Sequence, residues 1–317
     1  MVQEAPANQT ALTELIMLGF TSQPSLARLL FGLFLVMYMV TLLGNGLIVA
    51  LVWADPSLHT PMYFFLISLS CSETAYTLVV VPRMLGDLLS LCHTISFSAC
   101  ATQMFFFVAL GVTDCLLLTG MAVDRYMAIC SPLRYSAIMN YRICCGLVGG
   151  ALTGGVLFSL ILSVLVFSLP FCGPKHIPHF FCDIPPVLRL VCPGNETSET
   201  AIHVLVVLTL ILPFVFILLS YIRILMAVLC MGSAQHRRKA FSTCGAHLTV
   251  VLLHYSCAIF MYARPRVHYM PEKDRLIAVS YTIVIPMLNP LIYTLRNNDV
   301  QGALHKLLGC GPLTPKG

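Results

Sequence analysis

The chain is 317 residues long, with 58% hydrophobic and only 10% charged residues, and its mean hydropathy is +0.88. Soluble domains carry about a quarter charged residues, so this composition excludes an ordinary soluble domain and predicts one domain embedded in a membrane. The net charge of +5 comes from short loops without a long basic run, which argues against nucleic acid and leaves membrane lipid as the expected surroundings.

The first 28 residues are predicted to be an extracellular amino-terminal tail. They lack a basic start, an apolar core and a small-residue cleavage site, so the first spanning helix is expected to act as the targeting signal. Asn8 begins an Asn-Gln-Thr acceptor pattern for N-glycosylation and is the predicted site, because a free tail is accessible. Asn195 fits the same pattern but lies close to Cys192 and to the next helix, so its modification is left open.

Seven long, continuously apolar windows lie between residues 29 and 295, which we predict to form one membrane domain. They cover residues 29–53, 61–89, 98–129, 143–169, 200–230, 240–263 and 274–295. Strands of a membrane barrel would instead show segments of about ten residues with alternating polarity. Because lipid offers the backbone no hydrogen-bond partner, helices are the expected spanning form. The predicted fold class is therefore all-α, a bundle of seven transmembrane helices.

Several windows contain an internal proline, at Pro82, Pro213, Pro286 and Pro290, where each ring removes a backbone hydrogen bond and is expected to kink or open its helix. Residues 296–317 are predicted to be a cytoplasmic tail. Its first part mixes leucines with basic side chains, which favours a short amphipathic helix on the membrane surface.

The basic residues give only a weak signal for orientation. With the amino terminus outside, ten of the eighteen lie on the cytoplasmic side, and the Arg-Arg-Lys run at 237–239 is the densest group. We therefore expect a plasma-membrane protein with its amino terminus extracellular.

A series of short motifs runs along the windows in a fixed order. They are Gly44-Asn45, Pro61-Met62-Tyr63-Phe64-Phe65-Leu66, Met121-Ala122-Val123-Asp124-Arg125-Tyr126-Met127-Ala128-Ile129-Cys130, Ser220-Tyr221, Lys239-Ala240-Phe241-Ser242-Thr243-Cys244 and Pro286-Met287-Leu288-Asn289-Pro290-Leu291-Ile292-Tyr293. Together they cover nearly the whole chain. In this order they resemble the vertebrate odorant receptors, a family of rhodopsin-like G-protein-coupled receptors.

The resemblance implies a receptor that binds a small organic odorant and activates a stimulatory, olfactory-type heterotrimeric G protein, raising cyclic AMP. A chemoreceptor of the same architecture for an endogenous metabolite is the alternative. A transporter or channel would show inverted repeats or a chain of interior charges. An enzyme is not expected, since no nucleophile and base pair stands out.

Switch residues are carried over from the matching motifs at the inner ends of the helices. They are Asp124, Arg125, Tyr126, Tyr221, Lys239, Asn289, Pro290 and Tyr293. An arginine at a helix end can pair with a neighbour such as Asp124, and opening that pair would expose a cation to a cytoplasmic partner. A surface arginine that reaches the interface is the alternative.

Four of the fourteen cysteines lie at the predicted outer side, namely Cys100, Cys172, Cys182 and Cys192, where thiols are oxidised. Four cysteines allow three pairings, and free thiols also remain possible. The resemblance implies the pairs Cys100 with Cys182 and Cys172 with Cys192.

Glu73 and Asp114 lie deep inside the second and third windows, where a carboxylate on an isolated helix costs about 2.5–3.5 kcal/mol. The resemblance to the wider superfamily suggests that they hold a sodium ion, although Glu73 stands where most members have aspartate. The alternative is a pair of protonated carboxyls that hydrogen-bond to Asn45 or Asn289. No other cofactor is expected.

A ligand pocket is expected between the outer halves of the third, fifth, sixth and seventh windows. Counting from the motifs gives the candidates Phe107, Val108, Gly111, Val112, Leu205, Val206, Thr209, Tyr255, Ala258, Ile259, Tyr262, Val279 and Thr282. Any one of them could instead serve ordinary helix packing.

The candidate set favours a neutral ligand. Phe107 stands where a buried counter-ion for an amine would be needed, and the seventh window has no central lysine for a retinal Schiff base. Odorant receptors commonly read Phe-Tyr-Gly in the sixth window, where this chain has His254-Tyr255-Ser256. A histidine inside a helix is usually structural, and a pH-sensing or metal-binding role for His254 is the alternative.

Overall fold

The computed structural model describes residues 13–21, 23–90, 93–172, 175–264 and 270–307, apart from the side chains at 236, 238, 239, 242, 243, 296 and 298. The proposed acceptor Asn8 lies outside the described residues, as do residues 308–317 of the predicted tail.

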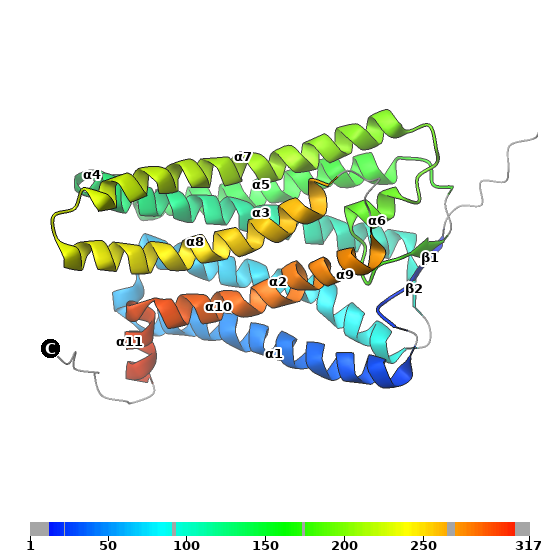
Figure 1. Cartoon of the computed structure of the whole chain (residues 1–317), viewed down its shortest axis with the longest axis horizontal. Coiled ribbons are helices and arrows are strands. Elements are labelled where there is room, and N and C mark those ends of the chain that lie inside the picture. Colours follow the sequence, from blue (N-terminus) through cyan, green and yellow to red (C-terminus); the bar gives the residue numbers. More distant parts are fainter. Residues whose placement is uncertain (1–12, 22, 91–92, 173–174, 265–269, 308–317) are drawn as a thin grey trace, which may run out of the picture.

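Seven helical segments are long and apolar enough to cross a membrane and run side by side along the molecule (Figure 1). Six are the helices α1 (Pro24–Ala54), α2 (Pro61–Leu89), α3 (Phe97–Cys130), α5 (Tyr141–Phe167), α7 (Glu196–Leu229) and α8 (Ala234–Tyr262). The seventh is continuous through α9 (Pro271–Val279), η3 (Ser280–Val284) and α10 (Ile285–Arg296). The predicted all-α bundle of seven spans is therefore confirmed.

Several helices extend beyond their apolar windows. The first helix begins at Pro24, inside the segment predicted to be tail, because proline suits the first turn of a helix, where its missing N–H leaves no bond unmade. Helices α7 and α8 likewise start four and six residues before their windows, within polar sequence. Hydropathy marks only the lipid-facing length, so it cannot detect helical turns that continue into the loops.

The seventh span changes its winding in the middle. The turn η3 is a π-helix, and Pro286 follows it as the second residue of α10. The proline ring would crowd the carbonyl four residues earlier in a regular helix, and a wider turn relieves that crowding. By contrast, Pro82, Pro213 and Pro290 lie inside continuous helices.

Three short strands and a short helix gather at one end of the bundle, here called the disulfide end (Figure 1). Strand β1 (Glu14–Met17) lies between β2 (Thr94–Ser96), which is antiparallel to it, and β3 (His176–Ile177), which is parallel. Helix α6 (Ile184–Leu188) follows in the loop between α5 and α7. The sequence motifs did not predict these elements, which cover the bundle end.

The opposite end, here called the Arg125 end, carries η1 (Pro56–Leu58), α4 (Pro132–Ile138) and α11 (Asn298–Leu307). The amphipathic helix expected after the last span is α11. Lys306 on α11 lies 2.9 Å from an Asp55 carboxylate oxygen next to α1, and Tyr63 on α2 donates to Asn297 at 3.1 Å. These contacts hold α11 against the first two helices.

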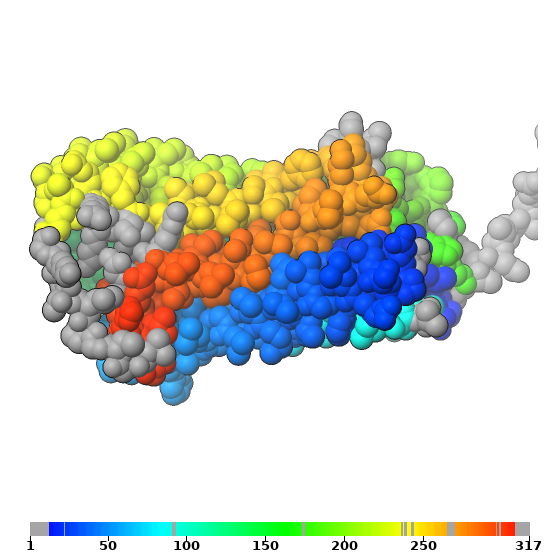
Figure 2. All heavy atoms as spheres, turned by 60° about the horizontal axis from the view of Figure 1, so that its bottom comes forward, coloured from blue at the N-terminus to red at the C-terminus, as the bar shows by residue number. Residues whose placement is uncertain are grey.

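Helix α3 occupies the centre and packs against α2, α5, α7 and α8. On the face shown in Figure 2, α1 lies along the last span. A methyl group at Gly44 of α1 would come within 2.8 Å of the Pro290 ring, so the glycine permits this close approach.

Helices α3 and α5 approach each other closely at Gly155. A Cβ atom there would overlap the carbonyl oxygen of Ala109 and the hydroxyl oxygen of Thr113. Thr113 uses that hydroxyl to bond the Ala109 carbonyl at 2.8 Å, so neither atom is free to move aside. The contact sets the position of α5 against the central helix.

We therefore expect Gly155→Ala to lower the free energy of unfolding by about 1–3 kcal/mol through overpacking. The measurement is thermal unfolding of the purified protein. Gly150→Ala on the same helix is the control, because a Cβ there meets nothing within 4 Å. Equal stability of the two variants would contradict the assigned contact.

Candidate functional site

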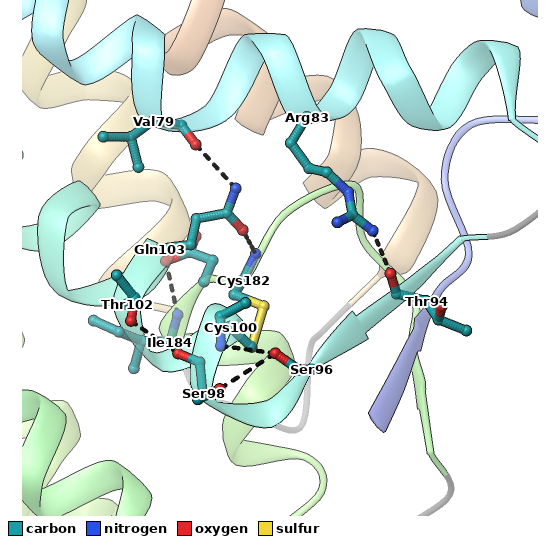
Figure 3. Close-up of a disulfide and its surroundings, with 12 residues drawn as sticks. Val79, Arg83, Thr94, Ser96, Ser98, Cys100, Thr102, Gln103, Cys182 and Ile184 are labelled. Carbon is teal, nitrogen blue, oxygen red and sulfur yellow. Dashed lines mark hydrogen bonds between the residues drawn. A yellow bond between two sulfur atoms is a disulfide. The ribbon is translucent and has the colours of Figure 1, made fainter. Parts of the chain in front are cut away.

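The disulfide end is tethered to α3 through the expected cysteine pairs. Cys100 is bonded to Cys182 (Figure 3). Cys172 is bonded to Cys192. The first bond links the start of α3 to the loop that covers the bundle. The second closes that loop on itself.

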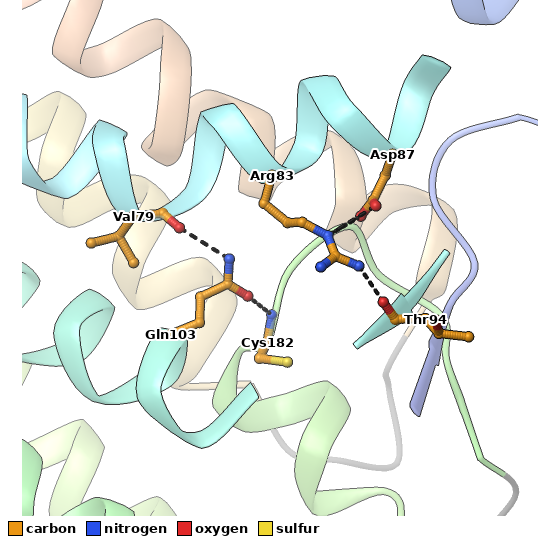
Figure 4. Close-up of polar contacts among 6 residues, drawn as sticks. All are labelled: Val79, Arg83, Asp87, Thr94, Gln103 and Cys182. Atoms are coloured by element: carbon orange, nitrogen blue, oxygen red, sulfur yellow. Dashed lines mark hydrogen bonds and ion pairs between the residues drawn. The ribbon is translucent and has the colours of Figure 1, made fainter. Parts of the chain in front are cut away.

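Gln103, one turn after Cys100, strengthens the tether (Figure 4). Its amide nitrogen donates to the Val79 carbonyl at 3.0 Å, and its amide oxygen accepts from the Cys182 N–H at 2.9 Å. Close by, Arg83 bonds both Asp87 and the Thr94 carbonyl, which joins α2 to β2. The loop is therefore held by α2 and α3 together.

Beneath this loop a cavity of about 70 Å³ opens between α2, α3, α5, α7, α8 and η3. It is lined by Tyr76, Phe107, Val108, Gly111, Val112, Cys115, Phe158, Val206, Thr209, Leu210, His254, Ala258, Tyr262 and Tyr281. The walls are mostly apolar, with a few hydroxyls, one thiol and one imidazole.

Eight of the thirteen predicted pocket residues line this cavity. The five that do not are Leu205, Tyr255, Ile259, Val279 and Thr282. Thr282 is fully buried and donates its hydroxyl to the Ala278 carbonyl, and Tyr281 faces the cavity instead. Regular helical counting from Asn289 fails here because the π turn shifts the face of the last span.

Tyr255 points away from the cavity, toward the Arg125 end. Its ring stacks on Phe214 with centroids 5.0 Å apart, and its hydroxyl donates to the Cys115 carbonyl at 3.3 Å. The preceding residue, His254, takes the cavity position. Tyr255 is therefore not one of the residues that line this cavity, although it bonds the backbone of one of them, Cys115.

A buried carboxylate lies behind two tyrosines of the cavity wall. Asp183 follows the tethered Cys182 and is 0% exposed. Tyr262 donates to it at 2.8 Å, Tyr281 at 2.7 Å, and the Ile184 N–H at 2.7 Å. Burial raises the pKa of Asp183 to about 6, although the hydrogen bonds from these donors lower it. The sequence reading did not single out Asp183, although an acid directly after a disulfide cysteine was a usable signal.

The tyrosines that hold Asp183 also line the cavity. Tyr262 was expected to bond a ligand, and in this structure its hydroxyl is already engaged by Asp183. A molecule entering the cavity would compete for the same hydroxyls. The loop, α8 and the last span are thus joined through the Asp183 carboxylate.

Because its folded pKa lies above the ordinary 3.8, Asp183 binds a proton more readily in the folded state, so its contribution to stability grows as pH falls through about 6. From about pH 7.5 to about pH 5 we expect a gain of about 1.4 kcal/mol from this group. Thermal unfolding across this range checks it. Asp183→Asn should lose this increment and Asp87→Asn, at the same end, should keep it. An unchanged pH profile in Asp183→Asn would contradict the assignment.

In the middle of the bundle, polar atoms from four helices converge. Asn289 of α10 donates to Glu73 of α2, and Glu73 and Asp114 lie close enough to interact electrostatically. Two buried amide oxygens, Asn45 Oδ1 and Asn289 Oδ1, lack a hydrogen-bond partner, and the Ser72 hydroxyl lies beside Asp114. Orphaned oxygens beside carboxylates suit a hard cation. The residues therefore fit the expected sodium ion. The Glu73–Asn289 bond also fits the alternative, in which protonated carboxyls hydrogen-bond to Asn45 or Asn289.

At the Arg125 end, the charges of Arg125 and Asp124 interact, although Asp124 takes its side-chain hydrogen bond from another helix. Asp124 is 1% exposed and accepts a hydrogen bond from Tyr135 of α4 at 2.7 Å. Within the described part of the chain no ion pair joins the two residues, because Asp124 faces α4. One guanidinium nitrogen of Arg125 is buried without a partner.

Arg125 also lies near aromatic side chains of other helices. Its charge interacts with Tyr221 of α7 and Tyr293 of α10, both nearly buried. Tyr221 also shares a 2.6 Å hydrogen bond with His247 of α8, a residue that the motif reading missed. The structure thus brings four predicted switch residues, Asp124, Arg125, Tyr221 and Tyr293, to one end.

The other predicted switch residues occupy separate places. Tyr126 is half-buried on α3, and Pro290 packs near Gly44. Asn289 belongs to the central polar group. Lys239 lies in α8, and its side chain is outside the described residues.

Comparison with known proteins places these features in a family. The family model described as "Olfactory receptor" matches residues 34–310. Human olfactory receptor 10R2 is 51% identical over 302 residues, covering 95% of this chain and 90% of its own length. Human olfactory receptor 10K1 is 49% identical over 302 residues, covering 95% and 96%.

The fold also resembles a solved structure. Squid rhodopsin matches with a TM-score of 0.68 and 18% identity, covering 93% of this chain and 90% of its own. At this identity the likeness concerns the fold alone, and it supports the rhodopsin-like arrangement of the helices.

Proposed function

This chain belongs to the olfactory receptor family, a family of non-enzymatic, seven-helix G-protein-coupled receptors, and we propose that it detects a small, mostly neutral organic odorant in the cavity beneath the tethered loop. Binding favours a packing in which the Arg125 end admits a stimulatory, olfactory-type heterotrimeric G protein, which raises cyclic AMP. The chain lies in the plasma membrane with its amino terminus and the disulfide end outside the cell.

The cavity walls support this ligand class. No carboxylate or lysine is among the described residues that line it, so a charged ligand would lack a partner. Apolar side chains from α3, α5 and α7 supply the contact surface, and Thr209 adds a hydroxyl. A ligand of this kind is held by burial with one or two hydrogen bonds, which gives affinities in about the micromolar range.

The small cavity volume supports coupling between binding and conformation. Ligand sites commonly measure about 300–1,000 Å³, far above the 70 Å³ found here. An odorant with more than a few heavy atoms therefore requires the helices around it to separate. A ligand that binds the expanded packing more tightly shifts the population toward it, by no more than its difference in affinity.

Helix α8 offers a route from the cavity to the Arg125 end. It carries His254 on the cavity wall, Tyr255 in the bond with the Cys115 carbonyl and His247 in the bond with Tyr221. An outward tilt of α8 would stretch the Tyr221–His247 bond and uncover Arg125. The observation that carries the proposal is the buried, unpartnered guanidinium nitrogen at this end.

The test is a cyclic AMP reporter in transfected cells, screened against a chemically diverse odorant panel. Arg125→Ala should abolish the response to any active compound or weaken it at least about a hundredfold, since a charge-mediated contact is lost. Arg142→Ala is the control, because Arg142 is exposed at the same end of the molecule. Surface labelling of every variant separates loss of signalling from loss of delivery. Full signalling by Arg125→Ala would overturn the assigned role.

We further propose that Glu73, Asp114 and the orphaned oxygens around them hold a sodium ion. The cation would neutralise the buried carboxylates and stabilise the packing seen here. In sodium chloride the purified receptor should melt at a higher temperature than in equimolar potassium chloride, following the usual linkage between binding and stability. Asp114→Asn should remove the difference. A wild type that melts equally in both salts would support protonated carboxyls instead.

A further inference from the structure

Two side chains with metal-binding chemistry meet on the cavity wall. Cys115 of α3 and His254 of α8 both line the cavity, and Cys115 Sγ lies 3.5 Å from His254 Nε2. The two residues are 139 positions apart in the chain, so the packing of α8 on α3 alone brings them together.

The spacing of the two atoms matches that of ligands around one ion. Zinc binds cysteine sulfur at about 2.3 Å and histidine nitrogen at about 2.0–2.1 Å with tetrahedral angles. Two such ligands lie about 3.5 Å from each other, because a tetrahedral angle separates the two bonds. An ion could therefore sit between Sγ and Nε2 with little movement of either helix.

The surroundings leave the remaining coordination positions open. Among the described residues no group of three His, Cys, Asp or Glu side chains could hold a metal, so a third protein ligand of these types is lacking. Both ligands face the cavity rather than the lipid. An ion held here would complete its coordination with water or with a donor atom of a molecule in the cavity, as open zinc sites do.

We propose that Cys115 and His254 form a binding site for a borderline-soft cation of the zinc type inside the ligand cavity. The thiol and imidazole pair selects such an ion over sodium, magnesium or calcium, which prefer oxygen. On binding, the Cys115 thiol transfers its proton to water and its sulfur bonds the ion as a thiolate, while neutral His254 donates its Nε2 lone pair. Metal binding at this site requires neither an odorant nor a G protein, so it can be tested independently of the proposed function.

The test uses Zn²⁺ with the purified full-length receptor and follows the melting temperature in the absence of odorant. Zn²⁺ should raise the melting temperature of the wild type, since an ion that binds the folded state stabilises it. Cys115→Ala and His254→Phe should each weaken the apparent Zn²⁺ affinity at least about tenfold. The phenylalanine is the residue that the family pattern carries at this position, so this variant is expected to fold.

Matched controls remove the same residue types elsewhere. Cys257→Ala lies on α8 one turn beyond His254, and His203→Ala lies on α7; neither residue lines the cavity. Both should respond to Zn²⁺ as the wild type does. A wild type without a Zn²⁺ shift, or a shift that survives both Cys115→Ala and His254→Phe, would overturn the proposal.

A second measurement covers the case in which Cys115→Ala does not fold. Co²⁺ can replace Zn²⁺ and gives a near-ultraviolet absorption band when a thiolate binds it. The wild type and Cys257→Ala should show this band, and His254→Phe should show it only at Co²⁺ concentrations at least about tenfold higher. Equal titrations of the wild type and His254→Phe would exclude the site.

Discussion

Lipid cannot hydrogen-bond a polar group, and this constraint shapes the bundle from the backbone to the side chains. The backbone N–H and C=O groups bond each other within helices. Many serine and threonine hydroxyls also bond within their own helix, by donating to the backbone carbonyl four residues earlier. Examples are Thr41, Ser68, Thr74, Thr113, Thr119, Thr209, Ser220, Thr249, Ser280 and Thr282. Each of these bonds provides the hydroxyl with an acceptor inside its own helix.

Larger polar groups cannot satisfy themselves within one helix and therefore join different helices. Glu73 accepts from Asn289, Tyr221 pairs with His247, and Asp183 gathers two tyrosines. Each of these contacts connects elements that must move relative to one another if the receptor changes shape. The polar contacts thus hold the present packing together, and they are also the bonds that another packing has to break or replace.

The sequence predicted the large features of the fold well because they follow from local physics. Apolar length located all seven spans, and the motifs located the Arg125 end. Details that depend on tertiary contacts were not accessible. The π turn before Pro286 places Tyr281 rather than Thr282 on the cavity wall. Asp124 accepts its hydrogen bond from Tyr135 of α4. Periodicity assumes regular helices and nearest-neighbour partners, and neither holds at these positions.

The loop above the cavity shows how tertiary structure changes the meaning of a residue. In the sequence Asp183 is one acid in a polar loop. In the structure it directly follows Cys182, and the disulfide from Cys182 to Cys100 holds this part of the loop at the start of α3. Gln103 then holds the Cys182 backbone from below, so Asp183 has no freedom to turn toward water. The carboxylate therefore has to be satisfied by the hydroxyls of α8 and the last span. Tyr262 and Tyr281 also line the cavity, so a ligand bound there lies against the residues that join the loop to α8 and the last span.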